Sequence, residues 1–205
     1  MSNIKTVVDD KELKKVFDFI AKEFYEDARK YNEHYYTMGE RFLEMQKQLE
    51  IDNAFLMYIE EDNKIVAAIT GKGLDKEKKK ITIGVMAVSK KYRRKGYAKK
   101  LIKEFEARCI EKGIKHIDLG ARFRACPLYM ALDYKPSLMV QVFDFATIED
   151  VKKANEFKLK EGFSWQSDTY GFIFFEIDEV DEKYIDCFEK KVETAHVQYI
   201  FKKEL

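Results

Sequence analysis

The sequence predicts an α/β protein with a mixed central sheet and flanking helices, followed by a small C-terminal α+β unit. An amphipathic helix lies between two apolar strands near the middle of the chain, and a hairpin precedes them. The last third of the chain follows the order strand, helix, strand, strand, helix, strand. A helix between two buried strands is typical of a parallel crossover, so an all-β fold is excluded.

The chain is expected to begin with a short strand and two helices. Residues 4–8 are largely β-branched and are followed by Asp9, a residue type that accepts hydrogen bonds from the first turn of a helix. Apolar side chains then recur at helical spacing: Leu13, Val16, Phe17, Ile20 and Phe24. A second helix, over residues 34–49, is rich in Tyr, Met and Glu. Its side chains either pack between the two helices or line a substrate-binding wall.

The middle of the chain predicts a hairpin and a strand–helix–strand unit. Residues 54–59 and 65–70 flank a polar turn, which favours a hairpin. Residues 81–88 form an apolar strand, and residues 116–120 form the next one. The helix between them ends at Gly113 and has one apolar face: Leu101, Ile102, Phe105 and Cys109.

The C-terminal third predicts a separate α+β unit. After a short helix over 125–132, the expected elements are a strand over 138–145, a helix capped by Thr147 and Asp150, strands over 165–167 and 172–177, a helix over 181–192 and a strand around 197–201. This order is that of the split βαβ or ferredoxin-like arrangement. We therefore expect two domains, 1–137 and 138–205. With only 2 Pro and 9 Gly in the chain, they should abut or share the strand at 138–145.

Composition restricts the partners and the compartment. The chain has 38 Lys and Arg against 37 Asp and Glu, a net charge of +1, so no overall field attracts nucleic acid or an anionic membrane, although a local patch is not excluded. No apolar run approaches the ~18 residues of a membrane span, and no secretory signal is present. We expect a soluble, cytoplasmic protein without nucleic-acid or membrane partners.

The cysteines and histidines do not predict a metal site. Cys109, Cys126 and Cys187 are widely spaced, form no CxxC pair, and are accompanied by only three histidines in the whole chain. Free thiols in a reducing compartment are the expected state.

The segment 88–98 is the most informative part of the chain. It leaves a buried strand, passes Arg93, Arg94 and Gly96, and enters a helix. The N-terminus of a helix exposes backbone amides and a partial positive charge, so small residues there permit an anion to bind. The spacing is neither that of a Walker A loop nor that of a GxGxxG fingerprint. By itself such a loop is also consistent with a solvated turn.

Two motifs, one in this loop and one further along the chain, together indicate what the loop binds. Arg93, Gly96 and Ala98 form an RxxGxA pattern that resembles the coenzyme A loop of the GNAT superfamily of N-acetyltransferases. About thirty residues on, a second segment is similar to the AxxLYxxxGF helix of that family: Ala125, Leu128, Tyr129, Asp133 and Tyr134. The resemblance covers roughly residues 1–145 and implies a GNAT fold with acetyl-CoA as the acyl donor.

The resemblance also assigns roles to individual residues. It implies that backbone groups of Met86, Ala87 and Val88 pair with the pantetheine arm. The pyrophosphate is expected at the loop and the helix start, on Arg93, Arg94, Lys95, Gly96, Tyr97 and Ala98. Tyr129 matches the tyrosine that protonates the departing thiolate, and thus acts as a general acid.

Departures from the family pattern leave the general base open. Asp133 and Tyr134 replace the usual Gly and Phe, and Arg122 stands where relatives have Asn. The strand over 81–88 carries no acidic residue, where some members place the base. The candidates for the general base therefore lie elsewhere in the chain: Glu33, Glu40, Glu60, His116 and Asp118.

The sequence as a whole predicts an N-acetyltransferase that transfers an acetyl group from acetyl-CoA to a primary amine by direct attack on the thioester. The acceptor is a small molecule, a peptide N-terminus or a lysine. The alternative is a non-catalytic acyl-CoA sensor with the same fold. An RNA-associated role through the basic stretch 90–100 is less favoured because acidic residues surround it in sequence. Edge strands of the C-terminal part make a homodimer possible.

Overall fold

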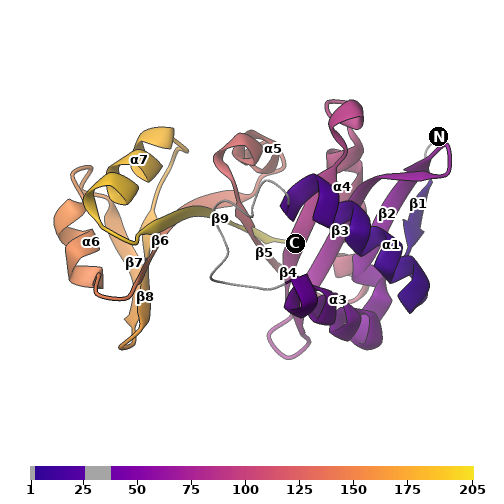
Figure 1. Cartoon of the computed structure of the whole chain (residues 1–205), viewed down its shortest axis with the longest axis horizontal. Helices are drawn as coiled ribbons and strands as arrows, with labels where there is room; N and C mark the ends of the chain where they lie inside the picture. The colour runs from indigo at the N-terminus through magenta and orange to yellow at the C-terminus, as the bar shows by residue number, and fades with distance from the viewer. Residues whose placement is uncertain (1–2, 26–37) are drawn as a thin grey trace. The chain divides into compact units, whose positions relative to one another are not determined.

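The computed structural model describes residues 3–25 and 38–205 of the chain. These residues form two compact units, Met1–Ile117 with Glu204–Leu205, and Asp118–Lys203. Each unit has its own strands and helices, and Figure 1 labels them along the chain. The predicted α/β class with flanking helices is confirmed.

The first unit carries a four-stranded antiparallel sheet in the order β1-β2-β3-β4. Its elements are β1 (Ile4–Thr6), α1 (Asp10–Ile20), η1 (Ala21–Tyr25), α3 (Met38–Asp52), η2 (Asn53–Phe55), β2 (Leu56–Glu61), β3 (Lys64–Asp75), β4 (Lys80–Val88), η3 (Lys90–Tyr92) and α4 (Tyr97–Glu111).

Local signals explain how these elements begin. The Asp9 side chain caps α1 by accepting a hydrogen bond from the Glu12 amide at 2.8 Å. Asp62 and Asn63 both have positive φ and form the two-residue turn between β2 and β3, as expected for a hairpin with this polar pair. The second predicted helix is present as α3 and extends to Asp52; the part predicted over 34–37 lies outside the described residues.

Helices cover the sheet of this unit on both faces. Figure 1 shows α1 and α3 crossing β2, β3 and β4. A core cluster joins these helices to the sheet through Val16, Phe17, Met45, Ala68 and Val85. The other face is covered by α4, whose Phe105 ring lies 5.2 Å from the Phe55 ring.

A β-bulge in β4 transfers the strand from one core to the other. Val85 pairs with Thr70 and Ile83 pairs with Gly71, so Gly84 has no partner on β3. Gly71 faces Phe105 of α4, which places its partner Ile83 on the α4 side. Val85 belongs to the cluster under α1 and α3. The bulge therefore reverses the inward face of β4 halfway along its length.

The second unit follows the predicted C-terminal order. Its elements are β5 (His116–Ala121), which begins in the first unit, η4 (Phe123–Ala125), α5 (Cys126–Met130), β6 (Lys135–Phe143), α6 (Ile148–Ala154), β7 (Lys160–Gln166), β8 (Tyr170–Glu176), α7 (Glu182–Lys191) and β9 (His196–Glu204). The strand order is β5-β9-β6-β8-β7. Because β8 lies between β6 and β7 and is antiparallel to both, the βαβ unit is split, and the ferredoxin-like prediction is confirmed.

The helices of this unit cover one face of its sheet. The Phe175 ring of β8 stacks on Phe188 of α7 with centroids 5.4 Å apart. Thr147 and Asp150 form the predicted capping box at the start of α6. Ile148, Val151 and Ala154 of α6 are buried.

The last strand returns between two earlier ones. β9 lies between β5 and β6 and is antiparallel to β6. The segment 144–195, with α6, β7, β8 and α7, is thus an insertion between two paired strands. The two compact units divide near residue 117. The boundary predicted at 137/138 is a different one, because it marks where the acetyltransferase domain ends, and it stays a prediction.

Candidate active site

The loop after β4 is held in place by its own backbone and by one arginine. The Tyr92 amide donates to the Ser89 carbonyl at 2.8 Å, and the Arg93 Nε donates to the Val88 carbonyl at 3.1 Å. Arg94 and Gly96 have φ angles of 65° and 84°. Left-handed residues in such a loop turn successive amides toward a common point, which is the geometry of an anion-binding nest.

The amides of this loop remain available. Within residues 3–25 and 38–205, none of the backbone amides from Arg94 to Ala98 donates a hydrogen bond. Gly96 is the N-cap of α4 and supplies no capping side chain, so the partial positive charge of this helix is uncompensated there. A Cβ added at Gly96 would meet nothing within 4 Å, so the space beside the amides is open.

Side chains fix the start of α4 rather than fill this space. The Tyr97 hydroxyl donates to Glu61 Oε1 at 2.9 Å, and this hydrogen bond raises the pKa of Tyr97. Lys95 Nζ lies 4.9 Å from the centroid of the Tyr92 ring. The Arg93 side chain is hydrogen-bonded to the last residue of β4, Val88. Arg94 has no ion-pair partner in the described part of the chain. Lys95 likewise has no acidic partner among the described residues, so Arg94 and Lys95 both keep a charge available for an anion.

The residues predicted to bind the pantetheine arm lie in the second half of β4. Met86, Ala87 and Val88 pair with Ile69, Ala68 and Ala67 of β3. The Ala87 side chain is buried in the α1/α3 core, which leaves only its backbone for a ligand. The loop and these strand residues all belong to the first unit.

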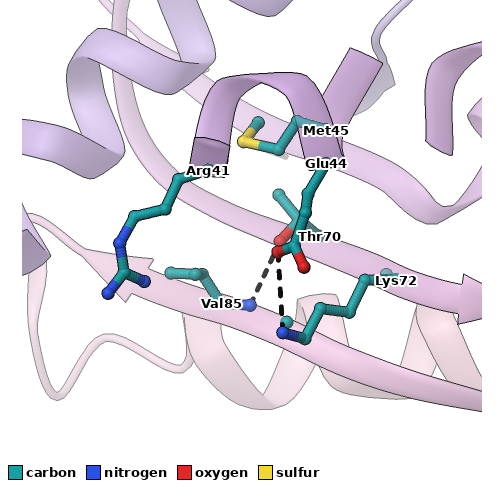
Figure 2. Close-up of a pocket in the computed structure, with 8 residues that line it drawn as sticks. Arg41, Glu44, Met45, Thr70, Lys72 and Val85 are labelled. Carbon is teal, nitrogen blue, oxygen red and sulfur yellow. Dashed lines mark hydrogen bonds and ion pairs between the residues drawn. The ribbon is translucent and has the colours of Figure 1, made fainter. Parts of the chain in front are cut away.

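A small pocket lies beside the bulge, between α3 and the strands. Figure 2 shows it, and it is lined by Arg41, Glu44, Met45, Thr70, Gly71, Lys72, Gly84 and Val85. Its cavity volume is about 30 Å³, which suits water or one small polar group. The missing side chain of Gly84 creates this space, since a Cβ there would lie 3.2 Å from Thr70 Oγ1.

Polar groups converge on the pocket from both sides. The Val85 amide, displaced by the bulge, donates to Thr70 Oγ1 at 3.1 Å. Glu44 Oε2 lies 3.6 Å from Lys72 Nζ, as the second dashed line in Figure 2 shows. Glu44 therefore presents a carboxylate next to the strand that the resemblance assigns to the acyl donor. No sequence pattern marks Glu44 itself, but a glycine inside an apolar strand, Gly84, is the signal that points to the bulge.

Tyr129 lies in the second unit, at the turn α5. Its side chain is 5% exposed, and its ring lies 5.8 Å from Tyr134 and 5.5 Å from Phe201. Burial raises the pKa of Tyr129 well above its usual value, so the hydroxyl keeps its proton at neutral pH. The turn after α5 uses Asp133 in a left-handed conformation with φ of 63°, which is compatible with the replacement of glycine noted above.

The candidate bases predicted from the sequence have neighbours of several kinds. Glu60 is ion-paired with Lys5, and His116 Nδ1 lies 3.8 Å from Glu204 Oε1. Glu40 lies on α3 and Asp118 lies on β5. Each of these two residues interacts with a neighbouring group, so neither is free. Glu33 lies outside the described residues.

The described residues contain no group of three or more His, Cys, Asp or Glu side chains arranged for a metal ion. All three cysteines are free; Cys109 and Cys126 are buried and Cys187 is half-buried. In the part of the chain that the structure describes, no helix is both long and apolar enough to cross a membrane.

Comparison with known proteins agrees with this architecture. An N-acetyltransferase from Staphylococcus aureus has 14% identity and a TM-score of 0.51, covering 87% of this chain and 98% of its own. A Pyrococcus horikoshii protein assigned as an acetyltransferase has 11% identity and a TM-score of 0.59 over 100% of this chain and 89% of its own. N-acetylglutamate synthase from Neisseria gonorrhoeae, solved with coenzyme A and N-acetylglutamate, has 12% identity and a TM-score of 0.51 over 100% of this chain and 35% of its own. No curated protein matches the chain.

These structural likenesses show a shared fold at low identity. The family itself is shown by the sequence: the model of the Acetyltransferase (GNAT) family matches residues 17–134, which include the loop after β4 and Tyr129. That match spans more than half of the chain, and so the chain belongs to the GNAT family of acetyltransferases and is an acyltransferase.

Proposed function

We propose that this acyltransferase is an N-acetyltransferase that transfers the acetyl group of acetyl-CoA to a primary amine by direct attack on the thioester. Family membership gives the general reaction, acetyl transfer from acetyl-CoA. The observation that carries the proposal further is the set of unused amides from Arg94 to Ala98 at the open N-terminus of α4. A pyrophosphate is the anion that such a nest and helix end would hold.

The donor is proposed to bind mainly through backbone. The pyrophosphate accepts hydrogen bonds from the loop amides, with Arg94 adding charge. Arg93 and Tyr97 act indirectly, because they fix the loop to Val88 and Glu61. Backbone groups of β4 from Met86 to Val88 are proposed to pair with the amides of the pantetheine arm.

Tyr129 is proposed to be the general acid. When the amine nitrogen attacks the thioester carbon and the carbon–sulfur bond breaks, the leaving thiolate takes the phenolic proton of Tyr129 and the phenolate regains one from solvent. A general acid must be protonated before the reaction, and Tyr129 meets this condition at neutral pH because burial keeps its pKa above the usual value. The shift does not make the hydroxyl a stronger acid, so the proposed role rests on the position of Tyr129 in the family motif.

Glu44 is proposed to receive the proton that the amine loses. Glu44 lines the pocket beside the bulge, and Val85 lines the same pocket. Val85 directly precedes Met86, the first residue of β4 that is proposed to hold the donor. The ion pair with Lys72, whose Nζ lies 3.6 Å from Glu44 Oε2, orients the carboxylate. An acceptor amine entering this pocket would meet a proton acceptor that β4 itself does not supply.

Thiol release from acetyl-CoA in the presence of a panel of amines tests the reaction. Tyr129→Phe should lower kcat by roughly 10²- to 10⁴-fold while leaving the Kd for coenzyme A unchanged. Tyr184→Phe, which changes another buried tyrosine of the same unit, is the control and should retain activity. Coenzyme A binding without turnover on any amine would contradict the N-acetyltransferase proposal.

The donor site is tested by calorimetry with acetyl-CoA. Gly96→Glu should abolish binding, because a carboxylate beside the amides repels the phosphates and φ of 84° disfavours any side chain. Gly113→Glu, at the opposite end of α4, imposes a similar strain at φ of 70° and should bind as the wild type does. Unchanged affinity in Gly96→Glu would place the phosphates elsewhere.

The proposed base is tested by the pH profile. Glu44→Gln should lower kcat most at low pH, where less of the acceptor amine is already deprotonated, with less loss at high pH. Glu50→Gln, an exposed position of the same helix, is the matched control. An equal loss at every pH would indicate a structural role for Glu44.

A further inference from the structure

The sheet of the second unit has one face that its helices leave uncovered. Ile173 and Phe175 of β8 point into the core under α6 and α7 and are 0% and 1% exposed. Side chains alternate along a strand, so Phe172 and Phe174 point to the opposite face. Their cross-strand partners on β6, Gln141 and Met139, lie on that same face.

Aromatic rings are concentrated on this uncovered face. We name it the aromatic face and define it by Phe163 and Trp165 of β7 and Tyr170, Phe172 and Phe174 of β8. Phe163, Trp165 and Tyr170 are 62%, 43% and 41% exposed, although each is a large apolar side chain. Exposed aromatic groups gathered on one sheet surface are unusual unless something binds them.

The rings form a continuous series. The Trp165 centroid lies 5.2 Å from Tyr170 and 5.8 Å from Phe172. Phe172 in turn lies 6.0 Å from Phe163 and 5.7 Å from Phe174. The planes of neighbouring rings are inclined by 33° to 81°, so the rings contact one another partly by their edges. A planar ligand ring can stack on the ring surface that stays exposed.

Charge on the same face favours an anionic ligand. On this face the carboxylate of Glu176, at the end of β8, is already paired with Lys160 of β7 at 2.9 Å. Lys135 and Lys202 stand directly opposite each other on β6 and β9, and neither has an acidic partner among residues 3–25 and 38–205. Like charges in this position repel, and a bound phosphate would relieve that cost.

Lysine and aromatic groups meet at one edge of the series. Lys202 Nζ lies 5.7 Å from the Phe174 ring centroid. Because this ammonium lies over the ring, a base that stacks there would displace it to the side, where it can meet the phosphate of the same nucleotide. Aromatic stacking with adjacent cations is how proteins hold single-stranded nucleic acid.

We propose that the aromatic face binds a single-stranded polynucleotide, with bases stacked on Phe172, Phe174 and Trp165 and phosphates near Lys135 and Lys202. The arrangement has the physical elements of sheet-based RNA recognition: a β-α-β-β-α-β unit with outward aromatic groups on a central strand. The spacing Gly171-Phe172-x-Phe174 places a small residue before two outward rings, as in the Gly-Phe-x-Phe core of the pattern described for such strands. The chain departs from that pattern at its other specified positions, which are occupied by Tyr170, Ile173, Phe175 and Ile177.

This inference does not depend on the acetyl-transfer proposal, since all of its residues lie in the second unit and outside the loop after β4. It is also compatible with a net charge of +1, because the binding rests on stacking and two local cations rather than on a long-range field.

Trp165 provides a direct signal, because it is the only tryptophan in the chain. Titration of the full-length protein with short oligouridylate, oligoadenylate and oligothymidylate should quench its fluorescence, whereas a duplex of the same length should not. Comparison of the ribose and deoxyribose oligomers shows which polynucleotide is preferred. With two lysines at phosphates, the logarithm of the binding constant should fall with the logarithm of salt concentration with a slope of about −1.4.

Variants locate the binding. Phe172→Leu and Phe174→Leu keep apolar volume but remove a ring, and each should weaken binding roughly 5- to 150-fold by fluorescence anisotropy. Phe145→Leu removes a 70% exposed ring that lies outside the strands and should have no effect. Lys135→Gln with Lys202→Gln should flatten the salt dependence, while Lys190→Gln on α7 should not.

Three results would overturn the proposal. The first is the absence of quenching and of anisotropy change with every single-stranded oligomer at low salt. The second is binding that survives both Phe→Leu variants, which would place the polynucleotide elsewhere. The third is a dimer in sedimentation analysis that Phe172→Leu dissociates, in a protein that binds no oligomer, because the face would then be an interface between copies of this chain.

Discussion

Burial divides the three cysteines by reactivity. The pKa values of Cys109 and Cys126 are each raised to about 12 by desolvation, so almost no thiolate forms at physiological pH. The half-buried Cys187 also has a raised pKa, but Lys191 opposes the shift. We expect iodoacetamide to modify Cys187 first and the other two only on unfolding, as followed by mass spectrometry of the intact chain. Equal rates for all three in the folded protein would contradict this burial pattern.

His196 makes stability depend on pH. Desolvation lowers its pKa below the usual 6.5, with Glu189 opposing the shift. The unfolded state then binds a proton more readily than the folded state, so stability is retained above pH 6.5 and lost as pH falls through the lower folded pKa. The free energy of unfolding in urea should therefore fall more steeply below pH 6.5 for the wild type than for His196→Gln. Parallel pH profiles would exclude His196 as the cause.

At individual positions, the sequence predicts the backbone conformation where that conformation depends mainly on the residue type itself. Gly96 before a helix and Asp133 at a turn both adopt the left-handed conformations that their residue types allow. Glu44 was not predicted, because its place beside Thr70 and Lys72 depends on the packing of α3 on a bulged strand. Such a contact joins positions distant in sequence, and no short-range pattern reports it.

Among the elements, α6 depends on its cap. Thr147 and Asp150 exchange hydrogen bonds at the N-terminus of this seven-residue helix, and the Thr147 Oγ1 accepts from the Asp150 amide at 3.2 Å. A helix this short has little stability of its own. Thr147→Ala should lower the free energy of unfolding by about 1 kcal/mol in urea titration. Thr169→Ala, at an exposed turn position, is the control and should change it far less.

Element identity was easier to predict than element length. The strand predicted over 138–145 runs from Lys135 to Phe143, and the strand predicted over 165–167 runs from Lys160 to Gln166. In both cases pairing with a neighbouring strand extends the element through polar residues that show no alternation of their own. The bulge at Gly84 likewise depends on pairing with a neighbouring strand. Residues 81–88 alternate in sequence like a regular strand, yet Ile83 faces α4 and Val85 faces α1 and α3.

At the scale of the whole molecule, the chain order and the strand order differ. The final strand β9 lies next to β5 and β6, and the Leu205 amide donates to the Lys115 carbonyl at 2.9 Å within the first unit. Residues 138–205 are therefore not a simple appendage. With only 2 Pro and 9 Gly in the chain and no linker rich in either, the sequence predicts a shared strand or a tight junction between residues 1–137 and 138–205, and this stays a prediction.

This order predicts that the fragment 1–137 does not fold on its own. It keeps β5 but lacks β9, the strand next to β5, and it removes Phe201, whose ring packs against Tyr129. Buried apolar surface around Tyr129 would become exposed, at a cost of about 25 cal/mol per Å². We expect the fragment to show no cooperative urea transition and no near-ultraviolet circular dichroism, in contrast to the full chain. A cooperative transition in the fragment would instead make 1–137 an autonomous acetyltransferase domain and leave β9 to the extension.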